Sequence, residues 1–124
     1  MKEVKYIPGD LVMYQGKVTT VRECRDNYYV LNCQHSIEDA VYYTDLKPVQ
    51  LTPKILKKNG WGKDYCIGNE DRYTKYDFLY ISYYRNDNTT KLFVKGLTLL
   101  SNIKYVHQLQ HLLFGLGLSM DLKV

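Results

Sequence analysis

The sequence predicts an α+β fold, with a small SH3-like β-barrel unit followed by a short helix and a small antiparallel sheet packed with a C-terminal helix. Turn residues recur about every 8–12 positions through the first part of the chain, as in small barrels. A capped helix signal follows, and an apolar stripe at helical spacing lies near the C-terminus. We therefore expect a barrel-like unit over residues 1–50, a connecting helix over 51–61, and a sheet with a helix over 62–124. The 124 residues have the size of one compact domain.

The first part of the chain predicts short strands joined by turns. Gly16 fits a tight hairpin turn between strands at 11–14 and 17–21. A β-rich run at 28–33 and a short run at 41–44 indicate two further strands. Small barrels of this kind are common adaptors, so the fold alone specifies no ligand.

A short helix is predicted directly after the barrel-like unit. Thr52 can cap its N-terminus, and Pro53 fits the first helical position, where its missing N–H group costs nothing. Asn59 and Gly60 can adopt the left-handed conformation that ends a helix. Trp61 follows, and we expect it to pack between the two halves of the chain.

The second half predicts a small antiparallel sheet. Residues 78–84 and 91–95 have strand composition and flank the polar turn at 85–90. A third strand is expected at 97–100 and a final edge strand at 119–122.

Period-two alternation sorts these strands into two faces. The expected core face carries Leu79, Ile81, Tyr83, Leu92 and Val94. The other face carries Phe78, Tyr80, Tyr84, Lys91, Phe93 and Lys95. Aromatic rings interleaved with lysines are what a base-stacking platform requires. The alternative is that this face packs against the N-terminal unit, with its lysines at the rim.

The C-terminal helix carries two different faces. Its core-facing stripe consists of Tyr105, Val106, Leu109, Leu112, Leu113 and Leu116. The opposite face holds His107, Gln110, His111 and Phe114. A histidine pair beside an apolar ring is an unusual surface to leave bare, so we expect it to meet another part of the chain, a partner or a ligand.

The spacing of His107 and His111 places two imidazoles on one side of a helix, as in the zinc-protease motif H-E-x-x-H. Gln108 stands where that motif has its general base, and an amide cannot take a proton from metal-bound water. The only further histidine is His35, and no nearby acid suggests a third ligand. We therefore expect no metal, no cofactor, no catalytic residue and no enzymatic activity.

Composition indicates a globular protein with a recognition surface. Hydrophobic residues make up 45% and charged residues 24% of the chain, and the net charge is +4. Three cysteines without C-x-x-C spacing, no signal-peptide run and no apolar span predict a cytoplasmic protein that does not enter membranes. Thirteen tyrosines and the ring of Phe114 supply more apolar ring surface than a monomer of this size easily covers. We expect a symmetric homo-oligomer, most simply a dimer.

Two segments carry a resemblance to a known group of proteins. They are the run from Leu46 to Trp61, LKPVQLTPKILKKNGW, and the run from Tyr105 to Leu113, YVHQLQHLL, after an N-terminal GDLV at Gly9. In this order the chain resembles short uncharacterised proteins of Bacteroidales gut bacteria, their prophages and their phages. The resemblance implies a small phage-type accessory protein that acts by binding in the host-cell cytoplasm. It carries no catalytic residue over to this chain.

Three classes of function fit these observations. The first is a non-enzymatic protein that sequesters a nucleotide, for example a cyclic nucleotide signal of host defence. The second is a nucleic-acid accessory protein, against which the small net charge argues. The third is a protein–protein adaptor or inhibitor. We expect the first class, with ligand-binding residues His107, His111, Phe114, Arg85, Arg72, Tyr84 and Trp61, and with Arg85 as a phosphate clamp over the histidine face.

Overall fold

The structure is a computed structural model that confirms an α+β fold with two antiparallel sheets and a C-terminal helix. It describes residues 6–25, 28–32, 40–42, 45–76, 78–94, 97–100 and 102–124. The chain forms two compact units. The first unit contains Met1–Val49 and Tyr105–Leu122, and the second contains Gln50–Lys104 and Lys123–Val124.

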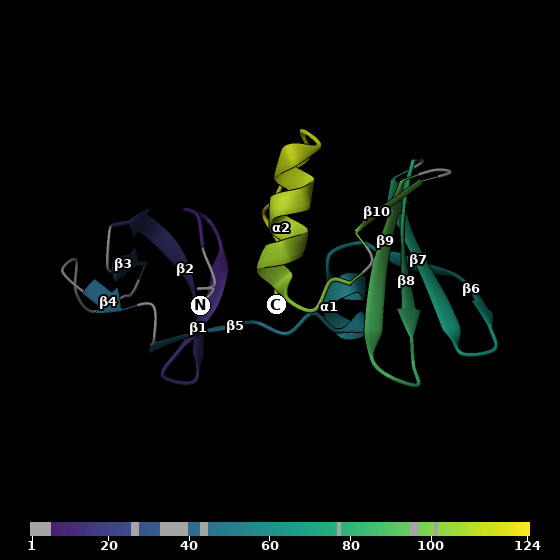
Figure 1. The fold of residues 1–124 in the computed structure, drawn as a ribbon, viewed down its shortest axis with the longest axis horizontal. Coiled ribbons are helices and arrows are strands. Elements are labelled where there is room, and N and C mark those ends of the chain that lie inside the picture. The colour runs from purple at the N-terminus through teal and green to yellow at the C-terminus, as the bar shows by residue number, and fades with distance from the viewer. Residues whose placement is uncertain are drawn as a thin grey trace. The chain divides into compact units, whose positions relative to one another are not determined.

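The first unit contains a curled antiparallel sheet (Figure 1). Its strands are β1 (Leu11–Tyr14), β2 (Lys17–Cys24), β3 (Tyr28–Leu31), β4 (Ala40–Tyr42) and β5 (Leu46–Pro48), in the spatial order β4-β3-β2-β1-β5. The strands expected at 11–14, 17–21, 28–33 and 41–44 are confirmed in outline, although residues 33, 43 and 44 lie outside the described residues. Strand β5 was not expected. It ends in Pro48 and lies at the sheet edge, where a residue without an N–H group is tolerated.

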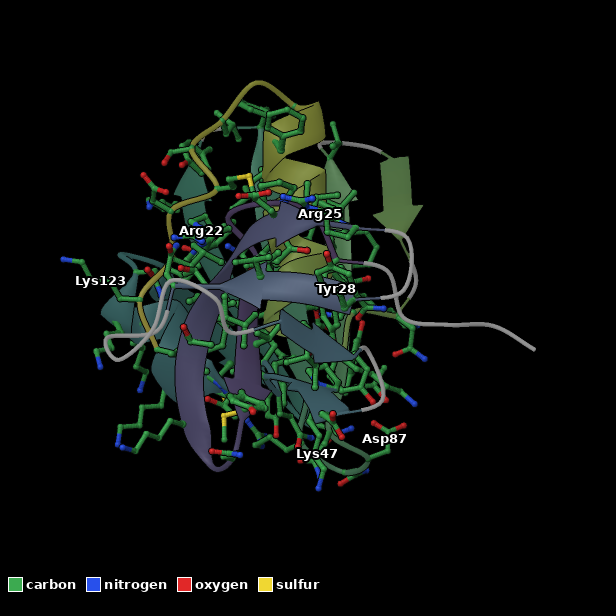
Figure 2. The ribbon with its side chains drawn as sticks, turned by 90° about the vertical axis from the view of Figure 1, so that its left-hand side faces the viewer. Arg22, Arg25, Tyr28, Lys47, Asp87 and Lys123 are labelled. Carbon is green, nitrogen blue, oxygen red and sulfur yellow. The ribbon has the colours of Figure 1, made fainter. Side chains whose placement is uncertain are left out.

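Tight turns join the first three strands. Gln15 and Gly16 both have positive φ angles, 51° and 78°, as a two-residue hairpin turn requires. At the next connection the N–H group of Arg25 donates to the carbonyl of Tyr28 over 2.9 Å, and Figure 2 labels both side chains. Inside the sheet, the core consists of Tyr6, Val12, Val21, Leu31 and Leu46.

Helix α2 (Val106–Gly115) belongs to this first unit, so its expected grouping with residues 62–124 is wrong. Buried Gln110 shows the physical reason. Its Oε1 accepts the N–H group of Leu11 over 2.9 Å, and its Nε2 donates to the carbonyls of Gly9 and Met120 over 3.0 Å each. Apolar periodicity cannot reveal the bonds to Gly9 and Leu11, because they join residues about one hundred positions apart.

The second unit is a helix followed by a meander of five described strands (Figure 1). The elements are α1 (Pro53–Lys58), β6 (Gly62–Ile67), β7 (Glu70–Tyr76), β8 (Leu79–Tyr84), β9 (Thr89–Val94) and β10 (Leu97–Leu100). The spatial order is β10-β9-β8-β7-β6, with every pairing antiparallel.

Three of these strands confirm the sequence prediction, namely β8, β9 and β10. The hairpin β6–β7 was missed, because β6 is exposed at every position except Tyr65 and therefore has no apolar alternation. The edge strand expected at 119–122 is wrong. Gly117 turns the chain with a φ of 75° after α2, and the carbonyl of Met120 accepts from Gln110 instead of joining a sheet.

Helix α1 begins and ends as predicted. The Oγ1 of Thr52 accepts the N–H group of Ile55 over 3.3 Å, and Gly60 has a φ of 86° after the helix. Trp61 is only 1% exposed and contacts the ring of Tyr76 edge to face, with centroids 6.0 Å apart. Trp61 is therefore a core residue, and its expected role in ligand binding is wrong.

An extra residue in β6 decides which side chains share a face of the second sheet. Lys63 pairs with Tyr73, and Tyr65 pairs with Arg72, so Asp64 is left over as a β-bulge. Because of this bulge, Lys63 and Tyr65 lie on opposite faces although they are two positions apart. The Nζ of Lys63 lies 3.8 Å from Asp71 on one face, while Tyr65 contacts Arg72 on the other.

We predict that Gln110→Met lowers the free energy of unfolding by about 2–4 kcal/mol. The new side chain is apolar and similar in length, but it leaves the N–H group of Leu11 and two carbonyls without their partner. Chemical denaturation of the purified variant measures this loss. Gln108→Met on the same helix is the control. Its loss should be smaller, because Oε1 of Gln108 accepts one N–H group, that of Tyr105, over 3.0 Å at the half-buried start of the helix. A Gln110→Met loss no larger than that of the control would contradict the prediction.

Candidate functional site

The predicted site residues fall into the two units. His107, His111 and Phe114 belong to the first unit, and Trp61, Arg72, Tyr84 and Arg85 belong to the second. Each group is described within its own unit.

The polar face of α2 meets another part of the chain, which was one of three expected alternatives. His107 is only 5% exposed, and its ring packs edge to face on Tyr6 with centroids 4.9 Å apart. Burial, together with nearby His111, lowers the pKa of His107 to about 4, so the ring is neutral at pH 7. Its Nδ1 has no hydrogen-bond partner within the described part of the chain.

His111 pairs with an acid that the sequence did not single out. The Nε2 of His111 lies 2.6 Å from Oδ2 of Asp10, whose side chain is fully buried. The same oxygen accepts the N–H group of Ile7 over 2.8 Å. Burial raises the pKa of the Asp10 carboxyl, and the hydrogen bonds from Ile7 and His111 oppose that rise. The available signal was a lone acid directly before an apolar strand, but nothing local pointed to a partner about one hundred positions away.

Through these contacts the histidine face packs α2 against the N-terminal segment, so it is not an open ligand site. Its three polar residues each touch the N-terminal segment of the same unit. Among the described residues, no group of three histidine, cysteine or acidic side chains could hold a metal ion. Phe114, at 63% exposure, is the one predicted site residue of α2 that stays largely open.

Arg85 is occupied by the turns of its own unit. Its guanidinium donates to Asp71, to the carbonyl of Gly68 and, over 3.2 Å, to the sulfur of Cys66. Its backbone N–H group donates to the carbonyl of Asn69 over 2.9 Å. Hydrogen bonds from Cys66 and Arg85 hold the pKa of Asp71 below its usual value. Arg85 therefore links the β6–β7 and β8–β9 connections. Its guanidinium already donates to groups of the protein, whereas the predicted phosphate clamp would need these N–H groups for the ligand.

The second sheet has one face that combines aromatic rings with cations. We call it the aromatic face and define it as Tyr65, Arg72, Tyr80, Tyr84, Lys91 and Phe93. Strand register places these residues together, since Tyr80 pairs with Phe93, and Ser82 pairs with both Arg72 and Lys91. All six are half-buried, whereas the opposite face holds the buried side chains Tyr73, Leu79, Ile81 and Leu92. Alternation predicted the places of Tyr80, Tyr84, Lys91 and Phe93 correctly, while Lys95 of the same prediction lies outside the described residues.

Four planar groups form a continuous stack across four strands of this face. The guanidinium carbon of Arg72 lies 4.3 Å from the ring centre of Tyr65 and 4.2 Å from that of Tyr80. On its other side Tyr80 stacks on Phe93, with centroids 5.0 Å apart and planes 15° apart. We call Tyr65, Arg72, Tyr80 and Phe93 the planar stack. Tyr65 was missed, because the bulge at Asp64 breaks the alternation that would have placed it.

Arg72 has cation–π contacts but no acidic partner in the part of the chain that the structure describes. Its Nε is buried and donates to no hydrogen-bond acceptor there. Glu70 lies on the same face, yet its Oε2 accepts the hydroxyl of Ser82 over 2.6 Å and forms no ion pair with Arg72. Lys91 lies with its Nζ 5.3 Å from the ring centre of Tyr84. A guanidinium without an ion-pair partner, together with a second cation on the same face, favours an anionic ligand.

Charge is distributed unevenly between the units. The second unit holds eleven of the 17 lysines and arginines but only five of the 13 acidic residues. The first unit holds six basic and eight acidic residues. The modest net charge of the whole chain therefore hides a distinctly basic unit, and the aromatic face belongs to that unit.

Comparison with known proteins gives no functional assignment for the aromatic face, so that assignment rests on its geometry. No protein-family model, curated protein or solved structure matches the chain. None of the described helices has the length and apolar character needed to cross a membrane.

We predict that the His107 site makes folding stability depend on pH below neutrality. The unfolded chain binds a proton near pH 6.5, but folded His107 takes it only near pH 4. Stability should therefore fall as pH is lowered from about 6.5 to 4, and this contribution should stop changing below that window.

His107→Phe removes the titrating group while keeping a ring, so its melting temperature should fall less than that of the wild type across the same window. The raised pKa of Asp10 acts in the opposite direction in both proteins, and the difference between them isolates His107. Melting curves by circular dichroism at pH 4 to 7 provide the measurement. Parallel pH profiles for the two proteins would show that His107 does not titrate in this way.

Proposed function

We propose that this chain is a non-enzymatic binding protein that holds a nucleotide through its phosphate on the aromatic face of the second sheet. The observation that carries the proposal is Arg72, held between the rings of Tyr65 and Tyr80 without an acidic partner in the described part of the chain. In the setting implied by the resemblance, such binding would sequester a nucleotide signal. We also propose that the curled sheet of the first unit is an SH3-like barrel that serves as a scaffold.

The chemistry of a stacked arginine supports phosphate recognition. A guanidinium between two rings loses its rotational freedom while its N–H groups still point outward in the plane. Phosphate oxygens accept two such N–H groups at once, which gives strong charge-assisted bonds. Lys91 lies on the same face two strands away, at about 10 Å from Arg72 by strand spacing. This separation suits a ligand with more than one phosphate group.

Two other classes of function are weighed against this one. A nucleic-acid role would use the same rings and cations, and the basic second unit makes it more plausible than the net charge of the whole chain suggested. An adaptor role would instead use exposed Phe114 of the first unit. Binding experiments on the aromatic face separate the adaptor from the other two.

We predict that the wild-type chain binds AMP, ADP and cyclic di-AMP, and that Arg72→Gln weakens binding about ten- to a hundredfold. The reason is the loss of a bidentate charge-assisted contact, worth about 1.5–3 kcal/mol. Lys91→Gln should weaken ADP more than AMP, because it lies farther along the face. Isothermal titration calorimetry with each nucleotide gives the affinities.

Arg25→Gln is the matched control for the loss of one arginine. Arg25 is exposed in the first unit and pairs with Glu23, so nucleotide affinity should not change. Melting temperatures establish that each variant is folded. If Arg72→Gln is folded and binds every nucleotide as tightly as the wild type, the proposal is wrong. If the wild type binds none of them, the adaptor function through Phe114 takes its place.

A further inference from the structure

The planar stack ends at an edge of the second sheet. Strand β6 is the last described strand on that side, and Tyr65 is the member of the stack that it supplies (Figure 1). One face of the Tyr65 ring contacts the guanidinium of Arg72. The sheet has no further described strand that could cover the opposite face of this ring.

Each of the other rings of the aromatic face has a ring or cation contact, and each has a further described strand beside it. Tyr80 has Arg72 on one side and Phe93 on the other. Phe93 is followed by β10, whose Thr98 pairs with it. Tyr84 carries the ammonium group of Lys91 over its ring. Tyr65 is therefore the ring at the end of the planar stack, and a further planar group can stack on the side of its ring away from Arg72.

We infer that Tyr65 is the base-stacking residue of the nucleotide site: the base lies on the free face of Tyr65 and extends the planar stack by one member. The inference rests on the proposed function and adds the position of the base. A nucleotide carries its phosphate and base on opposite sides of a ribose. Here the phosphate site at Arg72 and the stacking face are separated by the ring of Tyr65, so one ligand can reach both around the edge of β6.

The bulge at Asp64 independently supports a special role for this position. If the strand were regular through Asp64, Tyr65 would share a face with Lys63, which lies beside Asp71. Edge-strand bulges commonly re-aim a side chain next to a functional site. Tyr65 is also the only half-buried residue in a strand that is otherwise exposed, as its packing on Arg72 requires.

The test compares AMP with ribose 5-phosphate, which has the same phosphate and sugar but no base. The quantity of interest is the ratio of their dissociation constants, measured by calorimetry for each variant. Both ligands bind their phosphate at the Arg72 site. If a substitution shifts Arg72, the resulting change in phosphate affinity therefore cancels in the ratio. For the wild type we expect AMP to bind about five- to a hundredfold more tightly, as stacking of one base on an aromatic ring provides.

Tyr65→Leu should reduce the ratio to near one, and Tyr65→Trp should keep or increase it. Tyr83→Leu is the matched control on the opposite face of the same sheet, where the Tyr83 hydroxyl donates to Asn88, and it should leave the ratio at its wild-type value. A wild-type ratio of one, or an unchanged ratio in Tyr65→Leu, would overturn the inference while leaving the phosphate site intact. If Tyr65→Leu does not fold, a Tyr65→Trp ratio below that of the wild type overturns it. If the wild type binds neither ligand, the proposed function fails first.

Discussion

The first unit depends on the polar contacts that fasten α2 to the beginning of β1. Gln110 satisfies the N–H group of Leu11 and two carbonyls, and His111 meets the buried carboxylate of Asp10. Buried polar groups are costly unless they are paired. Separating α2 from the beginning of β1 would therefore leave donors and acceptors of both segments unpaired. The first unit thus joins an N-terminal and a C-terminal segment of the chain, and the main part of the second unit, Gln50–Lys104, lies between them in sequence.

This constraint changes the meaning of the histidine face. In the sequence, His107 and His111 are the most conspicuous candidates for chemistry, because their spacing places two imidazoles on one side of a helix. In the structure, His107 is a buried neutral ring against Tyr6, and His111 contacts one carboxylate oxygen of buried Asp10. The second unit holds the excess of basic residues, and within it Arg72 has no acidic partner among the described residues. The aromatic face, and not the helix, is therefore the better candidate for binding an anion.

Local patterns were reliable wherever the physical cause was local. The cap at Thr52 and the left-handed Gly60 fixed the limits of α1, and period-two alternation sorted Tyr80, Tyr84 and Phe93 onto one face. The partnership of Asp10 with His111 could not be predicted, since it depends on tertiary packing over about one hundred residues. Tyr65 could not be predicted either, because one extra residue in a strand inverts the faces of everything that follows it.

The irregularities in the pairing of β7 shape the core and the aromatic face of the second sheet at once. The bulge at Asp64 moves Tyr65 onto the face of Arg72 and keeps Lys63 beside Asp71. A second register shift, between Thr74 and Tyr76, lets Tyr76 pair with Leu79 on the buried face, where its ring meets Trp61. In a regular strand Tyr76 would share the face of Arg72 and Thr74, and the core would lose the ring that packs on Trp61. Two register shifts therefore place one tyrosine against Trp61 and another against Arg72, although the two side chains are chemically identical.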